Sequence, residues 1–256
     1  MERGIYEALV DNMTFSYSRV SCFGNCRYQW LLKYIYECED KEMFYASYGS
    51  FIHKILERFY KGELKRDDLL IEFLSGFETE VKGDRPSDSI VSSYIQKGCD
   101  YFRNFKPLPL NTVAVEKKIK FRVGKYNAVG IIDYIGEKDG NLYIVDNKSR
   151  DLKPRSKRSK PTSKDKELDE MLKQLYIYSE AVKQEYGKYP ISLCFNCFKS
   201  GVFIEEPFVE STHKEVLNWY ESQIDKIKKS EDFYPSIEFF MCKYLCGVQH
   251  ECCYYE

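Results

Sequence analysis

The stretch Gly130-Ile-Ile-Asp-Tyr-Ile-Gly-Glu-Lys-Asp-Gly-Asn-Leu-Tyr-Ile-Val-Asp-Asn-Lys148 predicts a β-hairpin, because two runs rich in β-branched residues flank an Asp-Gly turn. If Asp139-Gly140 is the two-residue turn, Asp133 lies directly opposite Asp146, with their Cβ atoms about 5 Å apart. Side chains alternate along a strand, so Asp146 and Lys148 leave the same face. The hairpin therefore predicts two carboxylates and a lysine in one place.

Two carboxylates this close repel each other, particularly among Ile and Val residues, and a divalent cation between them would remove the repulsion. A metal held by Asp133 and Asp146 is what metal-assisted phosphodiester cleavage requires, because it polarises the phosphate and lowers the pKa of a bound water. Lys148 can orient that water or neutralise developing charge. The alternative is an exposed hairpin with ordinary surface charges, since Asp-x-Lys is a short and common pattern.

The order Gly-x-x-Asp, then Asp-x-Lys, resembles the PD-(D/E)XK nuclease superfamily, specifically its RecB-like branch. Gly49-Ser-Phe-Ile-His53 resembles the upstream Gly-x-x-x-His of that branch, and Gln174-Leu-Tyr-Ile-Tyr178 resembles its Gln-x-x-x-Tyr helix motif. Glu116 falls on the preceding strand, where the family often has a glutamate. The motifs are similar to those of CRISPR-associated adaptation nucleases and of the nuclease domains of AddAB-type recombination helicases.

The resemblance implies roles for individual residues. The metal ligands would be His53, Asp133, Asp146 and the backbone carbonyl of Asn147, and the metal would be Mg²⁺ or Mn²⁺. Lys148 would support the attacking water, so the predicted catalytic set is these three side chains together with Lys148. Gln174 and Tyr178 would position the DNA strand.

The hydrophobic pattern predicts an α/β (or α+β) fold with a mixed central sheet flanked by helices, which in this family is the restriction-endonuclease-like fold. We expect helices within 16–36, 45–60, about 66–106, 167–186 and 212–229, and strands at 113–123, 128–135, 142–147, 191–198 and 202–207. A single nuclease domain would span 1–256, with its core at 40–210. A metal cluster would join the terminal helical segments, 16–38 and 236–256.

Charge is balanced, with 39 Lys and Arg against 40 Asp and Glu, which argues against nucleic-acid binding over the whole surface. Between Lys148 and Lys166, nine cations accompany two Asp residues, an excess of seven positive charges. The segment predicts either a solvated loop or a phosphate-binding strap, and its position directly after the hairpin favours the strap. The predicted DNA contacts within it are Arg150, Lys153 and Arg155.

Ten cysteines need an explanation other than disulfides, because residues 1–15 lack the apolar run of a signal peptide and predict a cytoplasmic protein. The run Cys242-x₃-Cys246-x₅-Cys252 is dense enough for a metal site. By the same resemblance, a [4Fe–4S] cluster would tie the two ends of the chain together. Its ligands would be Cys26, Cys242, Cys246 and Cys252.

Alternatives stay open for this cluster. Cys22 could replace Cys26, Cys253 could replace Cys252, and His250 is a further candidate ligand. Four thiolates also suit Zn²⁺. The pattern departs from the family's usual Cys-x₂-Cys, and the residue after Cys26 is Arg where proline is frequent. The cysteines predicted to pack as small apolar residues are Cys38, Cys99, Cys194 and Cys197.

The predicted function is that of an Mg- or Mn-dependent deoxyribonuclease, an exonuclease that prefers single-stranded ends in CRISPR adaptation, recombination or phage DNA metabolism. The sequence has no Walker A motif, so a helicase or adaptation-complex partner would be a separate protein. No stretch approaches the ~18 apolar residues of a spanning helix, which predicts no membrane partner. The alternatives are a catalytically inactive DNA-binding or scaffolding subunit, against which the complete metal set argues, and a structural zinc protein.

Overall fold

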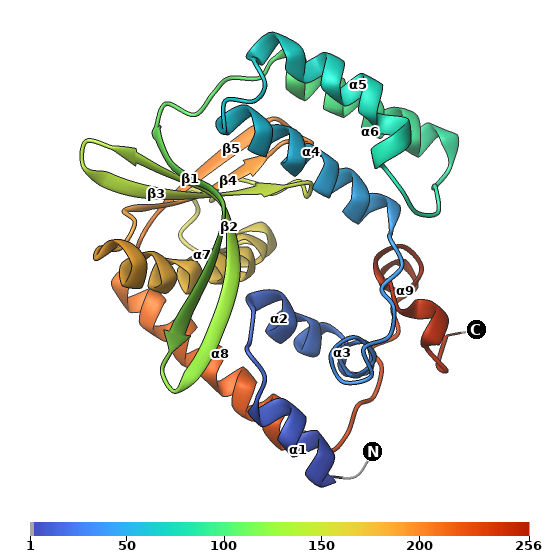
Figure 1. Ribbon diagram of the computed structural model, residues 1–256. Helices are drawn as coiled ribbons and strands as arrows, with labels where there is room; N and C mark the ends of the chain where they lie inside the picture. The colour runs from blue at the N-terminus through green and yellow to red at the C-terminus, as the bar shows by residue number, and fades with distance from the viewer. Residues whose placement is uncertain (1–2, 256) are drawn as a thin grey trace.

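The computed structural model describes residues 3–255 and contains a five-stranded mixed sheet flanked by helices (Figure 1). The strands, in their order across the sheet, are β1 (Asn111–Val123), β2 (Tyr126–Lys138), β3 (Asn141–Lys148), β4 (Ser192–Cys197) and β5 (Val202–Pro207). Strands β3 and β4 pair in parallel, and the other neighbours pair antiparallel. The predicted fold class is confirmed. Met1, Glu2 and Glu256, which the predicted domain includes, lie outside the described residues.

Helices lie on both sides of the sheet, with α4 above it and α7 below it in Figure 1. The helices are α1 (Arg3–Asp11), α2 (Tyr17–Asn25), α3 (Arg27–Tyr34), α4 (Phe44–Tyr60), α5 (Leu69–Glu80), α6 (Asp88–Arg103), α7 (Ser163–Tyr186), α8 (Glu210–Lys229) and α9 (Phe239–Leu245), with short 3₁₀ turns η1 (Arg66–Asp68) and η2 (Gln249–Glu251). Among the described helices, none is long and apolar enough to cross a membrane.

Two hydrophobic cores hold these layers together. The larger core packs α7, α8 and the N-terminal helices against the sheet and includes Leu175, Ile144 and Trp30. The smaller core joins α4, α5 and α6 through stacked and edge-on aromatic rings around Phe73. Tyr60 of α4 packs on the sheet at Tyr134, with ring centroids 4.6 Å apart. Helices therefore pack on both faces of the sheet.

The predicted hairpin register is confirmed. Lys138 pairs with Asn141 across the turn, and the ladder continues to Tyr134 opposite Val145. Asp139 and Gly140 have φ of 52° and 75°, the left-handed conformations that a tight two-residue hairpin turn needs. Asp133 and Asp146 are the next residues on the two strands, so both carboxylates lie where the hairpin opens.

Several element boundaries differ from the sequence prediction. The helix expected within 16–36 is two helices, because Cys26 has an extended backbone and its sulfur accepts a hydrogen bond from the N–H of Gln29 as the cap of α3. The region 66–106 is broken at 81–87, where Gly83 has φ of 91°. Helix α7 begins at Ser163 rather than 167, because Thr162 and Asp165 form a reciprocal capping box. Helix α1, which the sequence reading did not predict, packs against α8.

The absent side chain of Gly130 sets how closely α7 approaches β2. A Cβ atom at this position would lie 2.5 Å from Cε1 of Tyr178, a ring that is almost fully buried. The backbone φ of Gly130 is not in the left-handed region, so its conformation does not require glycine. The close contact with Tyr178 does, because a side chain would not fit there.

We expect Gly130→Ala to lower the free energy of unfolding by about 1–3 kcal/mol, because the methyl group overpacks the contact between β2 and α7. Urea denaturation measures this value. Gly24→Ala is the control, since no heavy atom lies within 4 Å of its added Cβ and alanine favours the helix, so its stability should be unchanged or higher. Equal stability of the two variants would contradict the packing argument.

Candidate active site

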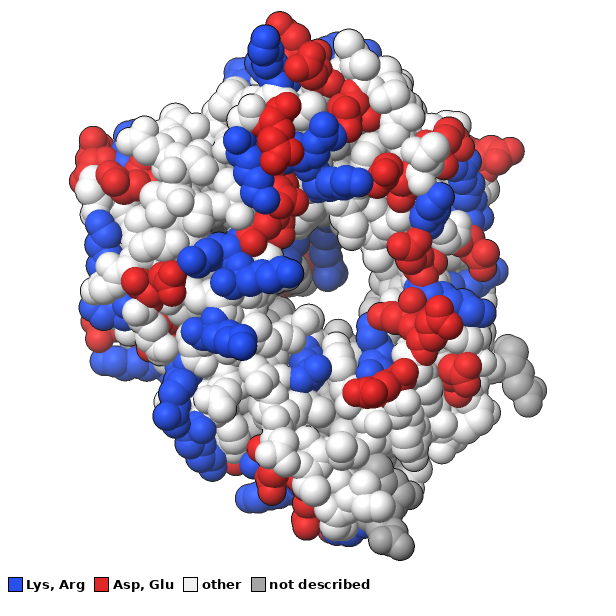
Figure 2. Space-filling model, viewed as in Figure 1, with Lys and Arg blue, Asp and Glu red and all other residues white. Residues whose placement is uncertain are grey.

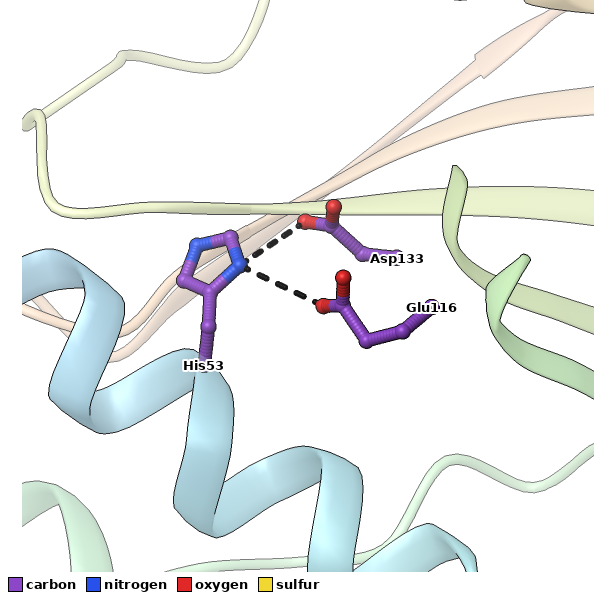
Figure 3. Close-up of side chains that lie close together, drawn as sticks. All are labelled: His53, Glu116 and Asp133. Carbon is purple, nitrogen blue, oxygen red and sulfur yellow. Dashed lines mark ion pairs between the residues drawn. The ribbon is translucent and has the colours of Figure 1, made fainter. Parts of the chain in front are cut away.

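Three side chains from different elements converge at the edge of the sheet (Figure 3). His53 comes from α4, Glu116 from β1 and Asp133 from β2. His53 Nδ1 lies 3.4 Å from Asp133 Oδ2 and 3.7 Å from Glu116 Oε1. One atom of each residue falls within 4.8 Å of the others, as in a metal-binding group. An imidazole nitrogen and two carboxylates are ligands that suit Mn²⁺, and the carboxylates also suit Mg²⁺.

A strained residue within β1 brings Glu116 into this group. Its φ is 47°, which is uncommon for a residue with a side chain. Val115 pairs with Tyr134 and Lys117 with Ile132, so Glu116 sits level with Asp133 on the neighbouring strand. Backbone strain of this kind costs of order 1–3 kcal/mol and persists where the surrounding structure holds it. Here it sits at the candidate metal site.

His53 bridges the carboxylates and the backbone of β3. Its Nε2 donates a hydrogen bond to the carbonyl oxygen of Asn147, 2.8 Å away. Burial alone would lower the pKa of His53, but the hydrogen-bonded carboxylate of Glu116 and the charges of Asp133 and Asp146 outweigh burial and raise the pKa to about 9. Without a metal, the proton on His53 therefore supplies the positive charge between the carboxylates.

The carboxyl group of Asp133 is also perturbed. Burial and the neighbouring charge of Asp146 raise its pKa to about 7, although His53 and a hydrogen bond from the N–H of Asn147, at 2.7 Å, act in the opposite direction. A cation at this place would offset the repulsion, so the electrostatics of the site favour a bound divalent metal.

Asp146 lies beside this group and pairs with the catalytic lysine predicted from the hairpin. Lys148 Nζ is 2.7 Å from Asp146 Oδ2, and the lysine donates a hydrogen bond to Gln174 Oε1 at 2.9 Å. Gln174 Nε2 in turn donates to the hydroxyl of Tyr178 at 3.4 Å. The contact of Asp146 Oδ2 with Lys148 lacks hydrogen-bond alignment, so this buried oxygen has no hydrogen-bond partner among residues 3–255. Its charge is balanced in this structure by the ammonium group of Lys148.

The structure brings the sequence-predicted residues together, with one addition. Of the predicted ligands, His53 and Asp133 lie in the three-residue group, whereas the ligand atoms of Asp146 fall outside it. Glu116, which the sequence reading noted by resemblance and did not assign as a ligand, takes a place in the group. Alternation along β1 could not reveal it, because the left-handed residue interrupts the regular strand. The carbonyl of Asn147, also a predicted ligand, faces His53.

Some cations of the basic segment after Lys148 are already paired with carboxylates. Arg150 pairs with Glu167 at 2.8 Å. Arg155 pairs with both Glu206 and Asp169, and those carboxylates raise its pKa. Of the three predicted DNA contacts, Lys153 alone has no acidic partner within residues 3–255. The net positive charge of this segment is therefore partly neutralised by α7 and β5.

The cysteines predicted to bind a cluster lie near one another although they come from opposite ends of the chain. Burial raises the pKa of Cys246 to about 11, and nearby Cys26, Cys242 and Cys252 add to the rise. Cys26 Sγ accepts hydrogen bonds from the N–H groups of Gln29 and Ser236, each at 3.4 Å. Of the cysteines predicted to pack as small apolar residues, Cys99, Cys194 and Cys197 are buried and Cys38 is half-buried.

Residues 14–253 match the family model of the PD-(D/E)XK nuclease superfamily. A crystal structure from Eubacterium rectale, named "Putative exonuclease", is 16% identical, with a TM-score of 0.54 over 96% of this chain and 90% of that chain. The structure of SSO0001 is also 16% identical, with a TM-score of 0.32 over 81% of this chain and 96% of that chain. No curated protein matches.

We expect the affinity for Mn²⁺ to fall as the pH is lowered from about 8 to about 6. Protons on His53 and Asp133, whose pKa values are raised to about 9 and about 7, must leave before the metal binds. The loss should reach up to about tenfold per pH unit for each proton displaced. Isothermal titration calorimetry in buffers of different ionisation enthalpy measures both the affinity and the protons released.

Asp133→Asn should abolish this pH-dependent binding, whereas Asp139→Asn, at the exposed hairpin turn, should bind Mn²⁺ as the unaltered protein does. An affinity that is constant across the pH range would show that the group of His53, Glu116 and Asp133 does not hold the metal.

Proposed function

Because this chain belongs to the PD-(D/E)XK nuclease superfamily, we propose that it is an Mg- or Mn-dependent deoxyribonuclease that degrades single-stranded DNA from an end. The observation that carries the proposal is the position of Lys148 and Asp146 beside the group of His53, Glu116 and Asp133. Metal ligands, a further carboxylate and a half-buried lysine meet at one place, as phosphodiester hydrolysis requires.

The residues of this site would have different roles in the reaction. His53, Glu116, Asp133 and Asp146, with the carbonyl of Asn147, would hold the metal. The bound metal supplies Lewis-acid polarisation of the phosphate and a water of lowered pKa. Lys148, held by Asp146 and Gln174, can hold the attacking water and balance the charge that develops on the phosphate. Tyr178, hydrogen-bonded to Gln174, supports this arrangement from α7.

Aromatic side chains next to the metal site support a preference for single strands. Tyr45 lines the same pocket as His53 and Glu116. It packs against Phe240 and Tyr244 of α9, with ring centroids about 6 Å away, and Phe240 is 48% exposed. Exposed rings can stack unpaired bases, which a duplex does not offer. Figure 2 shows that the surface is open at the centre of this view, beside these elements.

Lys148→Ala should lower the rate of cleavage by about 10²–10³-fold, because it removes a positive charge that acts in the transition state. Lys138→Ala, on the exposed end of the same hairpin, should cleave normally. The assay uses end-labelled linear single strands, the matching duplex and a closed circular single strand with Mn²⁺. An exonuclease that prefers single strands cuts only the first at full rate.

Cleavage by Lys148→Ala at the rate of the unaltered protein would contradict the proposed role of the lysine. If the unaltered protein cuts none of the substrates with Mg²⁺ or Mn²⁺, the alternative of an inactive DNA-binding subunit takes the place of the nuclease.

We further propose that Cys26, Cys242, Cys246 and Cys252 hold a [4Fe–4S] cluster, as in the RecB-like nucleases that the sequence resembles. The observation behind this proposal is that Cys26, Cys242 and Cys252 all lie close enough to Cys246 for their charges to raise its pKa. The two N–H groups directed at the Cys26 sulfur stabilise a thiolate. Cys22 instead donates to the side chain of Gln29, and burial raises its pKa to about 12.

Cys246→Ser should remove most of the bound iron and lower the melting temperature, because the two ends of the chain lose their shared link. Iron and acid-labile sulfide are measured on anaerobically purified protein. Cys38→Ser, at a half-buried cysteine outside the proposed ligand set, should keep its iron. Colourless protein that contains one zinc and no iron would overturn the cluster assignment.

A further inference from the structure

The ribbon formed by β1 and β2 carries a row of cations on its exposed face. Lys118, Lys120 and Arg122 are exposed, whereas the apolar residues that alternate with them are buried. Because side chains alternate along a strand, all three cations point to the same side. We call these three residues the cation row.

The cation row lacks the acidic partners that neutralise other cations of this protein. Within residues 3–255, no carboxylate forms an ion pair with any of the three. Lys117, on the opposite face of the same strand, pairs with Glu185 at 2.9 Å. Arg150 and Arg155 of the basic segment are likewise paired with carboxylates. The positive charge of the cation row is therefore available to a partner outside the chain.

The cation row leads directly to the candidate active site. It begins two residues after Glu116 on β1. On β2, Ile131 pairs with Lys118 and lies two residues before Asp133. Figure 2 shows Lys and Arg side chains gathered over the β1–β2 ribbon, on the rim of the central opening. A nucleic acid strand bound along the ribbon would reach the metal ligands at the Lys118 end of the cation row.

The spacing of the cation row matches a polyanion. Alternate residues of a β-strand are about 6.7 Å apart, which is on the order of the separation of successive phosphates in an extended nucleic acid strand. Ile131, 42% exposed, and Val129 add apolar surface next to the cations. Flexible cations beside an apolar strip suit the backbone of a nucleic acid rather than one compact anion.

We propose that Lys118, Lys120 and Arg122 bind successive phosphates of a single nucleic acid strand and guide it along β1 to the metal site. The proposal rests on the proposed function for the fate of the strand, because it assigns the surface that delivers the substrate. The competing explanation is that the lysines only protect β1, an edge strand of the sheet, from pairing with other chains.

The test measures binding of a fluorescein-labelled oligothymidylate by anisotropy in EDTA, where no cleavage occurs, from about 50 to about 200 mM NaCl. The variant is the triple Lys118→Gln/Lys120→Gln/Arg122→Gln. Its matched control is Lys82→Gln/Lys106→Gln/Lys138→Gln, which removes the same charge from exposed lysines elsewhere. A third variant, Lys118→Arg/Lys120→Arg/Arg122→Lys, keeps the charges of the row.

We expect the first triple variant to bind roughly 10- to 100-fold more weakly. The slope of log affinity against log salt should fall by about 0.7 for each lost phosphate contact, or about two in all. The control and the charge-conserving variant should bind as the unaltered protein does, and circular dichroism checks that each is folded. Unchanged affinity and slope in the first variant would overturn the proposal, as would an equal loss in the control.

A separate cleavage assay with Mn²⁺ distinguishes the two proposals. If the unaltered protein cuts DNA and the first variant binds normally, the nuclease stands and the cation row is not its substrate track. If the unaltered protein does not cut, yet the first variant alone loses binding, the cation row is a nucleic-acid interface and the nuclease proposal fails.

Discussion

The register of the β2–β3 hairpin is the constraint on which the candidate active site depends. A two-residue turn with left-handed backbone at Asp139 and Gly140 sets which residues of the strands face each other. A slip of one residue would send every side chain of one strand to the opposite face. Asp133 of β2 would then no longer lie beside Asp146 and Lys148 of β3. The turn at Asp139 and Gly140 lies outside the candidate active site, yet it decides whether the residues of that site can come together.

Electrostatic repulsion at the site is the second organising feature. Half-buried carboxylates gather where the sheet opens, and in the absence of metal His53 and Lys148 supply the opposing charge. This arrangement lowers the stability of the fold, because the carboxylates repel one another and the backbone of Glu116 is strained. The same features prepare a place for a divalent cation, so the cost in stability is consistent with a metal-dependent function.

The two ends of the chain converge on one side of the nuclease core. The N–H of Lys41 donates a hydrogen bond to the carbonyl of Gly247, and there is no room for a Cβ at this glycine because Asp40 lies against it. The rings of Tyr28 and Tyr254 pack edge-on with centroids 4.9 Å apart. These contacts bring the cysteines of both ends near each other and place α9 against α4, which carries His53. The proposed cluster would therefore support a wall of the active site.

The sequence by itself determined the hairpin, its register, the mixed sheet and the roles expected of His53, Asp133, Asp146 and Lys148. The hairpin and its register depend on local turn chemistry and on alternation along strands, which can be read from neighbouring residues. The roles expected of the site residues come from the resemblance of an ordered set of motifs to those of the family. The boundaries of the helices were harder to predict from the sequence, because the caps at Cys26 and Thr162 depend on individual side-chain hydrogen bonds.

Only the tertiary structure decided that Glu116 joins the metal-binding group and that, within residues 3–255, the cation row on β1 has no ion-pair partner whereas Arg150 and Arg155 are paired with carboxylates. A charge count along the chain cannot tell which cations are neutralised, because Glu167 and Glu206 approach the basic segment only after the helix and the strand have folded onto it. Which charges pair is decided by distances between elements that are remote in sequence, and those distances exist only in the folded chain.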